Sequence, residues 1–117
     1  MLSKDRTSLL GILDAIEKIE GFVSPFENAV DLFRDTALFD AVLMNFIVIG
    51  EMVSRLSIPF KESNKKVNWD KIKELRNVIA HDYFGVDAEE IWQVATTRLP
   101  KVRKDIQIIL KKDAKYR

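Results

Sequence analysis

Cysteine is absent from this 117-residue chain, and histidine occurs only once, at His81. Without thiols the chain cannot form disulfides, bind zinc or iron–sulfur clusters through cysteine, or use a thiol nucleophile. Alternating strand patterns, internal repeats and low-complexity tracts are absent as well. Apolar residues make up 47% of the chain, which is enough to bury the core of one domain. We therefore expect a single domain over residues 1–117.

An uninterrupted apolar segment of the signal-peptide kind is also absent, because residues 4, 5 and 6 are charged. The stretch Ala37–Leu56 has the length of a membrane span, yet it contains Asp40, Asn45, Glu51 and Arg55. Charges at that depth of a bilayer are costly. We therefore expect a cytoplasmic protein that does not associate with membranes.

Strong net charge is missing too, since the chain carries a formal net charge of +1. That average hides a gradient, because residues 1–60 have a net charge of −4 and residues 61–117 a net charge of +5. The basic side chains of residues 98–117 are Arg98, Lys101, Arg103, Lys104, Lys111, Lys112, Lys115 and Arg117. This run is either a surface that attracts a phosphate backbone or a solvated helix face.

Apolar residues recur every three or four positions along the chain, which is the pattern of amphipathic helices. Capping residues, prolines and glycines divide this pattern into segments. We predict a first helix that starts after Ser3 or Asp5 and ends at Gly21, a second from a Ser24 cap and Pro25 to about Arg34, and a third from Thr36 to about Leu56. A fourth helix follows Asn68 and stops before Gly85. A fifth begins in a capping box at Asp87, and Pro100 separates it from a sixth. Residues 57–68 are predicted to form a long loop. The expected fold is all-α, an antiparallel helical bundle of five to six helices.

The predicted helix from Thr36 to Leu56 is apolar around most of its circumference. Such a helix is buried on several sides. It is either the central core helix or a core helix that also forms a dimer interface. Asn45 and Glu51 are polar residues in this apolar wall, and each needs a partner if it is buried.

The single histidine lies in a segment that contains Arg76, Asn77, His81 and Tyr83. Arginine is a permanent cation suited to phosphate, and histidine exchanges protons near neutral pH. On a regular helix, Arg76 and His81 are separated by about 140° and point to different faces. Either the helix ends near Ala80 and the chain turns His81 back, or the two residues meet across a symmetric interface.

Cleavage of RNA without a metal needs a base for the 2′-hydroxyl, an acid for the leaving 5′-oxygen, and positive charge on the phosphorane. One chain offers one histidine. A two-fold dimer would bring two copies of His81 and of Arg76 to one cleft. We therefore hypothesise that the motif is half of a two-fold active site.

The run Arg76–Asp87 resembles the signature of HepT-like toxins of the HEPN superfamily, in which arginine is followed by four to six residues and a histidine, here extended to His-x-Tyr. Flanking segments are similar in the same order, so the resemblance covers nearly the whole chain. These segments are Asp40–Asn45, Ile49–Glu51, Trp69–Ile72, Ile91–Trp92 and Leu99–Pro100. The resemblance implies a HEPN-like bundle that forms a homodimer and acts as a metal-independent endoribonuclease toxin.

The resemblance also implies roles for individual residues. Arg76 would bind the scissile phosphate, His81 would act as acid or base, and Asn77 would orient the site or contact RNA. Tyr83 would be modified with AMP, taken from ATP by an antitoxin that is a minimal nucleotidyltransferase. The added bulk and negative phosphate would block the cleft to RNA. No metal and no cofactor are expected in the site.

Other interpretations of the same residues stay open. His81 at a helix end can serve as a C-terminal cap, and Arg76 can be a surface partner of Glu74 or Asp82. Phe84 is expected in the core. A second functional class is a non-catalytic, nucleotide- or partner-binding module associated with a nucleotidyltransferase. The presence of both Arg76 and His81 favours the enzyme.

Overall fold

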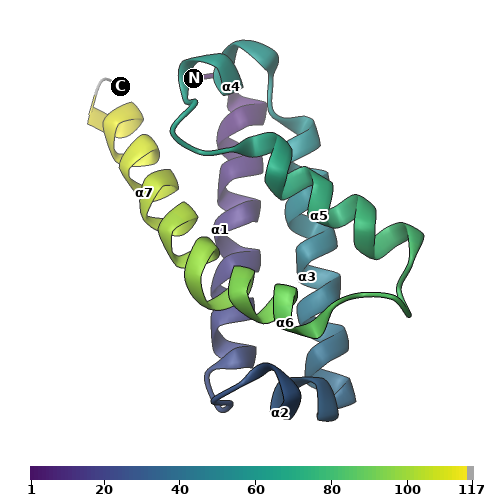
Figure 1. The fold of residues 1–117 in the computed structure, drawn as a ribbon. Coiled ribbons are helices and arrows are strands. Elements are labelled where there is room, and N and C mark those ends of the chain that lie inside the picture. Colours follow the sequence, from purple (N-terminus) through teal and green to yellow (C-terminus); the bar gives the residue numbers. More distant parts are fainter. Residues whose placement is uncertain (116–117) are drawn as a thin grey trace.

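The computed structural model describes residues 1–115, and within them it contains helices and no strand. Two long antiparallel helices, α1 (Ser3–Val23) and α3 (Thr36–Arg55), form the centre of the bundle (Figure 1). The other elements are α2 (Ala29–Arg34), α4 (Ile58–Ser63), α5 (Trp69–His81), α6 (Ala88–Gln93), the π-helical turn η1 (Val94–Arg98) and α7 (Leu99–Lys115). Because α6, η1 and α7 follow without a break, the described chain has six helical segments. The expected all-α bundle of five to six helices is confirmed.

The core lies where α1 and α3 face each other and where α5 and α7 cover them (Figure 1). Fully buried side chains of α1 occur at the three- and four-residue spacing of an amphipathic helix, and α3 contributes a matching set. These residues are Leu9, Ile12, Ile16, Ile19, Val42, Leu43, Phe46 and Ile49. Burial of a large aliphatic or aromatic side chain stabilises a fold by about 1.5–3 kcal/mol. The α1–α3 pair is therefore the main source of stability.

Helix α3 is long and apolar enough to cross a membrane by length and composition alone, and 39% of its most apolar stretch is buried within the structure. Its buried residues pack against the rest of the bundle as part of the core. Asn45 satisfies its amide within the helix, where Nδ2 donates to the Ala41 carbonyl over 2.8 Å. Met44 is 59% exposed, so one side of α3 is left open by the chain.

The connection between α1 and α3 differs from the sequence prediction. Helix α1 continues past Gly21 to Val23, and Ser24 has helical backbone angles and donates its hydroxyl to the Gly21 carbonyl. Ser24 therefore closes α1 and does not cap the next helix. Asn28 caps α2 instead, because its side chain accepts the Asp31 backbone N–H over 2.9 Å.

The predicted loop over residues 57–68 is partly wrong, because it contains the short helix α4. The Ser57 hydroxyl caps this helix, and its hydroxyl and backbone N–H both donate to the buried Asp5 carboxylate over 2.7 Å. Phe60 is buried against Trp69, with ring centroids 5.8 Å apart. The buried Asp5 and Phe60 attach this segment to the bundle. The sequence did not predict α4, because six residues are too few to show a helical periodicity.

Pro100 does not divide two helices, in contrast to the prediction. The chain stays helical from Ala88 to Lys115, and the turn before the proline widens into η1. There the Leu99 N–H bonds to the Val94 carbonyl, five residues earlier. A proline lacks an N–H and clashes with the carbonyl four residues before it, so the wider turn accommodates Pro100 where a regular turn would not.

Candidate active site

The Arg76–Tyr83 segment lies against α3, because α5 packs obliquely across α3 with the opposite chain direction (Figure 1). Asn68 caps α5, with its side chain accepting the Lys71 backbone N–H over 3.1 Å. At the other end, α5 finishes at His81 and Asp82 takes the C-cap position. This arrangement places the first part of the motif opposite Glu51 and the last part opposite Asp40.

The Arg76 side chain is 25% exposed and is held against α3. Its Nη1 donates to Glu51 Oε1 over 2.5 Å, so its ion-pair partner is Glu51 and not Glu74 or Asp82. Arg76 Nε is buried and has no hydrogen-bond partner among the described residues. Among the described residues, only Nη1 of the guanidinium has a hydrogen-bond partner, so this partly exposed group keeps N–H donors that a phosphate oxygen could accept.

Gly50 permits this packing of Arg76. A Cβ atom at Gly50 would lie 2.2 Å from Arg76 Cβ and 2.5 Å from Arg76 Cγ. The stem of the arginine thus lies directly on the α3 backbone. Glycine at position 50 sets both the close approach of the two helices and the place of the guanidinium.

Tyr83 follows α5, and its hydroxyl donates a hydrogen bond to Asp40 Oδ1 on α3. The hydrogen bond to Asp40 is the main cause that raises the pKa of the Tyr83 phenol, followed by burial and the negative charge of Asp40. The ring is 45% exposed, and the neighbouring Phe84 is 97% exposed. The expectation that Phe84 belongs to the core is wrong, because the turn that Asp82 and Gly85 close through their hydrogen bonds directs it to solvent.

His81 and Asn77 are exposed on α5, and neither side chain makes a hydrogen bond or ion pair with another described residue. Helix α5 stays regular through His81, so the chain does not turn His81 back before the helix ends. Arg76 faces α3, whereas His81 is open to solvent. The two residues are not brought together by helix geometry within one chain.

Asp40 and Glu51 are the residues of this site whose contacts sequence reasoning missed. They are eleven residues apart, which is close to three full helical turns, so both lie on the same face of α3. The sequence shows that the two residues share a face of α3, but it does not show that this face packs against α5. Each carboxylate holds a different motif residue, and no cluster of metal-ligating side chains occurs within residues 1–115.

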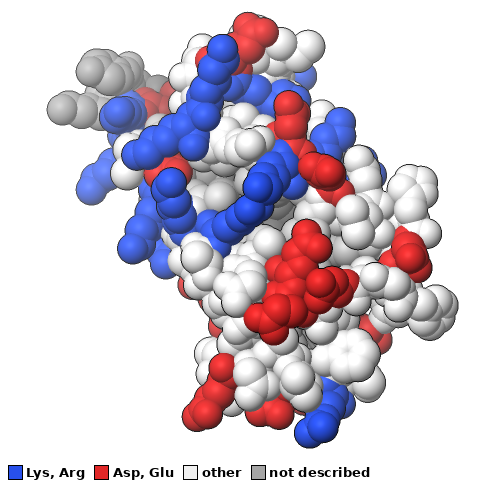
Figure 2. Space-filling view, in the orientation of Figure 1, with Lys and Arg blue, Asp and Glu red and all other residues white. Residues whose placement is uncertain are grey.

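The basic run of the last helix is divided between structural and solvent-facing side chains. Arg103 Nε donates to Glu20 Oε1 over 2.8 Å and so fastens α7 to α1. Arg98, Lys101 and Lys104 are exposed, and Figure 2 shows lysines and arginines gathered over α7 and the neighbouring segments. Arg117 lies outside the described residues.

The Ribonuclease HepT-like family model matches residues 12–109 of this chain. The chain is 34% identical over 98 residues to a protein named "Putative RNase" of Caldanaerobacter subterraneus subsp. tengcongensis, covering 84% of this chain and 83% of that protein. It is 30% identical over 94 residues to the "Probable ribonuclease HepT" of Thermococcus cleftensis, covering 79% and 83%.

A third relative is a longer protein of Methanocaldococcus jannaschii, named "Gamma-glutamylcyclotransferase and putative RNase". It is 32% identical over 99 residues, which are 85% of this chain and 44% of that protein, so the chain spans less than half of it. No solved structure matches the chain. The chain belongs to the HepT-like ribonuclease family.

The Tyr83–Asp40 contact gives a testable pH dependence. Tyr83 should ionise above its ordinary pKa of 10.0, and Asp40→Asn should move that pKa back toward 10.0 because the negative acceptor is removed. A raised pKa means that the folded state holds the phenolic proton more tightly. The stabilisation is therefore present below pH 10 and is lost as the pH rises through the raised value.

Tyrosinate absorbance during an alkaline titration measures this pKa. The difference between wild type and Tyr83→Phe isolates the Tyr83 signal from that of the second tyrosine. An unchanged Tyr83 titration in Asp40→Asn would contradict the assigned hydrogen bond.

Proposed function

We propose that this chain is a metal-independent endoribonuclease that works as a homodimer and is the toxin of a toxin–antitoxin pair. The observation that carries the proposal is the Arg76 guanidinium, which is anchored on α3 by a hydrogen bond from Nη1 to Glu51 while its side chain stays 25% exposed. An exposed histidine, His81, ends the same helix. The names of the relatives in the HepT-like family support ribonuclease activity.

In this proposal RNA is cleaved by its own 2′-hydroxyl. The 2′-oxygen attacks the adjacent phosphorus and the bond from phosphorus to the 5′-oxygen breaks. One His81 accepts the 2′-proton and a second His81 protonates the leaving 5′-oxygen. Arg76 stabilises the negative phosphorane, and Asn77 orients the RNA.

One chain contains one histidine, so this scheme needs two copies of the motif. A two-fold axis would bring both into one cleft. Exposed apolar side chains near the motif and on the open side of α3 support a second copy there, namely Phe84 and Met44. The dimer would also join the Arg76 and His81 side chains that helix spacing separates within one chain.

The proposed antitoxin is a minimal nucleotidyltransferase that modifies Tyr83. The Tyr83 oxygen would attack the α-phosphorus of ATP, pyrophosphate would leave, and Asp40 would accept the phenolic proton. The hydrogen bond from Tyr83 to Asp40 supports this assignment, since it provides an acceptor at the reacting oxygen. The attached AMP would place negative charge on the same α3–α5 contact that holds Arg76 and so exclude RNA.

A second candidate function is a non-catalytic binding module associated with a nucleotidyltransferase. The observation that favours it is the Glu51 carboxylate, which already pairs with Arg76. A paired guanidinium offers less positive charge to a phosphate. RNA cleavage separates the two candidates directly.

Purified protein should cleave single-stranded RNA in the presence of EDTA, and Arg76→Ala should reduce the rate by about 10²–10³ because a charge-stabilising donor is lost. Arg34→Ala is the matched control, since Arg34 is an exposed arginine on α2 outside the motif. It should cleave at the wild-type rate. No cleavage by wild type would rule out the enzyme and leave the binding module, whereas equal rates for all three proteins would refute the catalytic role of Arg76.

A further inference from the structure

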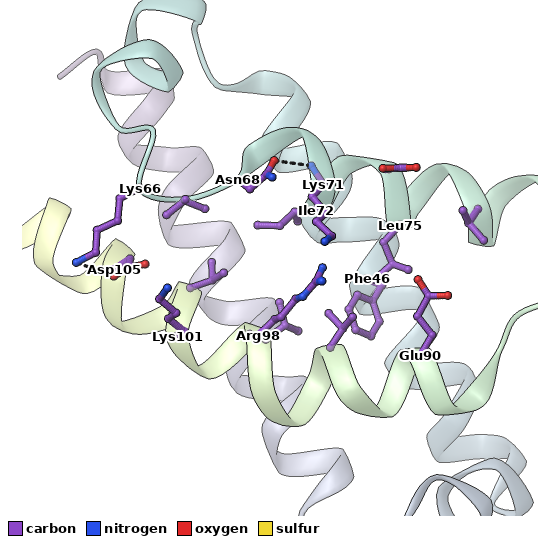
Figure 3. Close-up of a pocket in the computed structure, with 16 residues that line it drawn as sticks. Phe46, Lys66, Asn68, Lys71, Ile72, Leu75, Glu90, Arg98, Lys101 and Asp105 are labelled. Atoms are coloured by element: carbon purple, nitrogen blue, oxygen red, sulfur yellow. Dashed lines mark hydrogen bonds and ion pairs between the residues drawn. The ribbon is translucent and has the colours of Figure 1, made fainter.

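A cavity of about 470 Å³ opens between α5 and the continuous helix formed by α6, η1 and α7, with α3 behind it (Figure 3). Its floor is apolar and is formed by side chains of four elements. These are Phe46 of α3, Ile72 and Leu75 of α5, Val94 of η1, and Leu99 and Val102 of α7. An apolar floor of this size suits a planar organic group and not a hydrated ion alone.

Positive charge gathers at one end of this cavity. Lys71 of α5 and Arg98 of η1 point from opposite walls toward the same space, and Lys101 of α7 lies farther along, near Lys66 and Asp105 (Figure 3). None of the three forms an ion pair with a described residue, whereas Lys66 at the rim is paired with Asp105 over 3.5 Å. Bringing unpaired cations together is unfavourable, and a bound anion would remove that repulsion.

The other end of the cavity is acidic. Glu90 of α6 lies beside Phe46 and Leu75, away from Lys101, and Glu74 of α5 also lines the cavity (Figure 3). Neither carboxylate forms an ion pair with a described residue. Figure 2 shows the same separation on the surface, with a basic area and an acidic area on either side of a hollow. A carboxylate at this end can only accept hydrogen bonds, so it selects a group that carries N–H donors.

We propose that this cavity binds one nucleoside phosphate unit. The phosphate lies between Lys71 and Arg98, the base packs on the apolar floor, and Glu90 accepts hydrogen bonds from the edge of the base. Guanine fits this end best, because its adjacent N1–H and N2–H donors match the two carboxylate oxygens. Adenine and cytosine offer one amino group, and uracil offers a single N–H between two acceptors that a carboxylate repels.

The cavity and the motif share helix α5 but use different faces of it. Arg76 faces Gly50 and Glu51 on α3, whereas Lys71, Ile72 and Leu75 face the cavity. Two sources can supply the nucleotide, namely a free mononucleotide or a nucleotide of the RNA substrate. The second source rests on the proposed ribonuclease function, and there the cavity would read one base near the cleavage site.

Isothermal titration calorimetry of the full chain tests this site, with guanosine 5′-monophosphate and uridine 5′-monophosphate as probes. Wild type should bind the guanine nucleotide at least tenfold more tightly. Arg98→Gln should weaken both nucleotides about tenfold or more, since a charge-assisted contact to phosphate is lost. Glu90→Gln should weaken the guanine nucleotide alone and so abolish the preference.

Lys104→Ala is the matched control, because Lys104 is an exposed lysine of α7 that does not line the cavity. It should bind like wild type. Absence of guanine nucleotide binding by wild type, or equal binding by wild type and Arg98→Gln, would overturn the proposal. All four proteins are compared by thermal melting, so that a loss of binding is not mistaken for a loss of folding.

A 2′-O-methyl RNA oligonucleotide, which cannot be cleaved, distinguishes the two sources. Tighter binding of an oligonucleotide with one guanine than of the free nucleotide supports an RNA site, and the reverse supports a free nucleotide. Binding without RNA cleavage would leave this inference standing and refute the proposed function, whereas cleavage without binding would refute only the inference.

Discussion

Replacing His81 with alanine should reduce the rate of RNA cleavage by roughly 10²–10⁴, the contribution of a general acid or base. His81 is the only histidine in the chain, so no other imidazole can take over its proton transfer. Its side chain is exposed and makes no hydrogen bond with another described residue, so the melting temperature should hardly change. Initial rates on a labelled RNA and a thermal melt give the two readouts.

A dimer with one wild-type chain and one His81→Ala chain makes this test sharper. If the two histidines act as base and acid in a single cleft, the mixed dimer should be nearly as slow as the dimer in which both chains carry His81→Ala. If each chain works alone, the mixed dimer should keep about half of the wild-type rate. Half activity would refute the two-fold site while leaving His81 catalytic, and full activity of the homodimeric variant would refute a role for His81.

Replacing Gly50 with alanine should destabilise the protein by roughly 1–3 kcal/mol, the usual cost of inserting a methyl group into close-packed structure. The new Cβ would lie 2.2 Å from Arg76 Cβ, so α5 must move away from α3. That movement also displaces the guanidinium from Glu51. Urea denaturation measures the stability, and RNA cleavage should fall in the same variant.

Gly21→Ala provides the matched control within the same protein. Gly21 lies in α1, and a Cβ there would meet no heavy atom within 4 Å. Because alanine is favoured over glycine inside a helix, this variant should gain about 0.5–1 kcal/mol. The two substitutions should therefore change stability in opposite directions. A stabilised Gly50→Ala variant would contradict the close contact between α3 and Arg76.

The sequence by itself determined the fold class and the location of the motif. The three- and four-residue spacing of apolar side chains predicted α1, α3 and α5 because local periodicity is set by helix geometry. The caps Asn68 and Asp87 were readable for the same reason, since each side chain bonds to a backbone N–H within three residues. These features depend on neighbouring residues alone.

Tertiary structure alone decided the partners of the motif. The contacts of Arg76 with Glu51 and of Tyr83 with Asp40 join residues that are 25 and 43 positions apart. The exposure of Phe84 and the formation of helix α4 likewise depend on what the chain packs against. Local spacing fixes which face a residue occupies on its own helix, but only the packing of α5 on α3 brings an arginine and a tyrosine to two carboxylates.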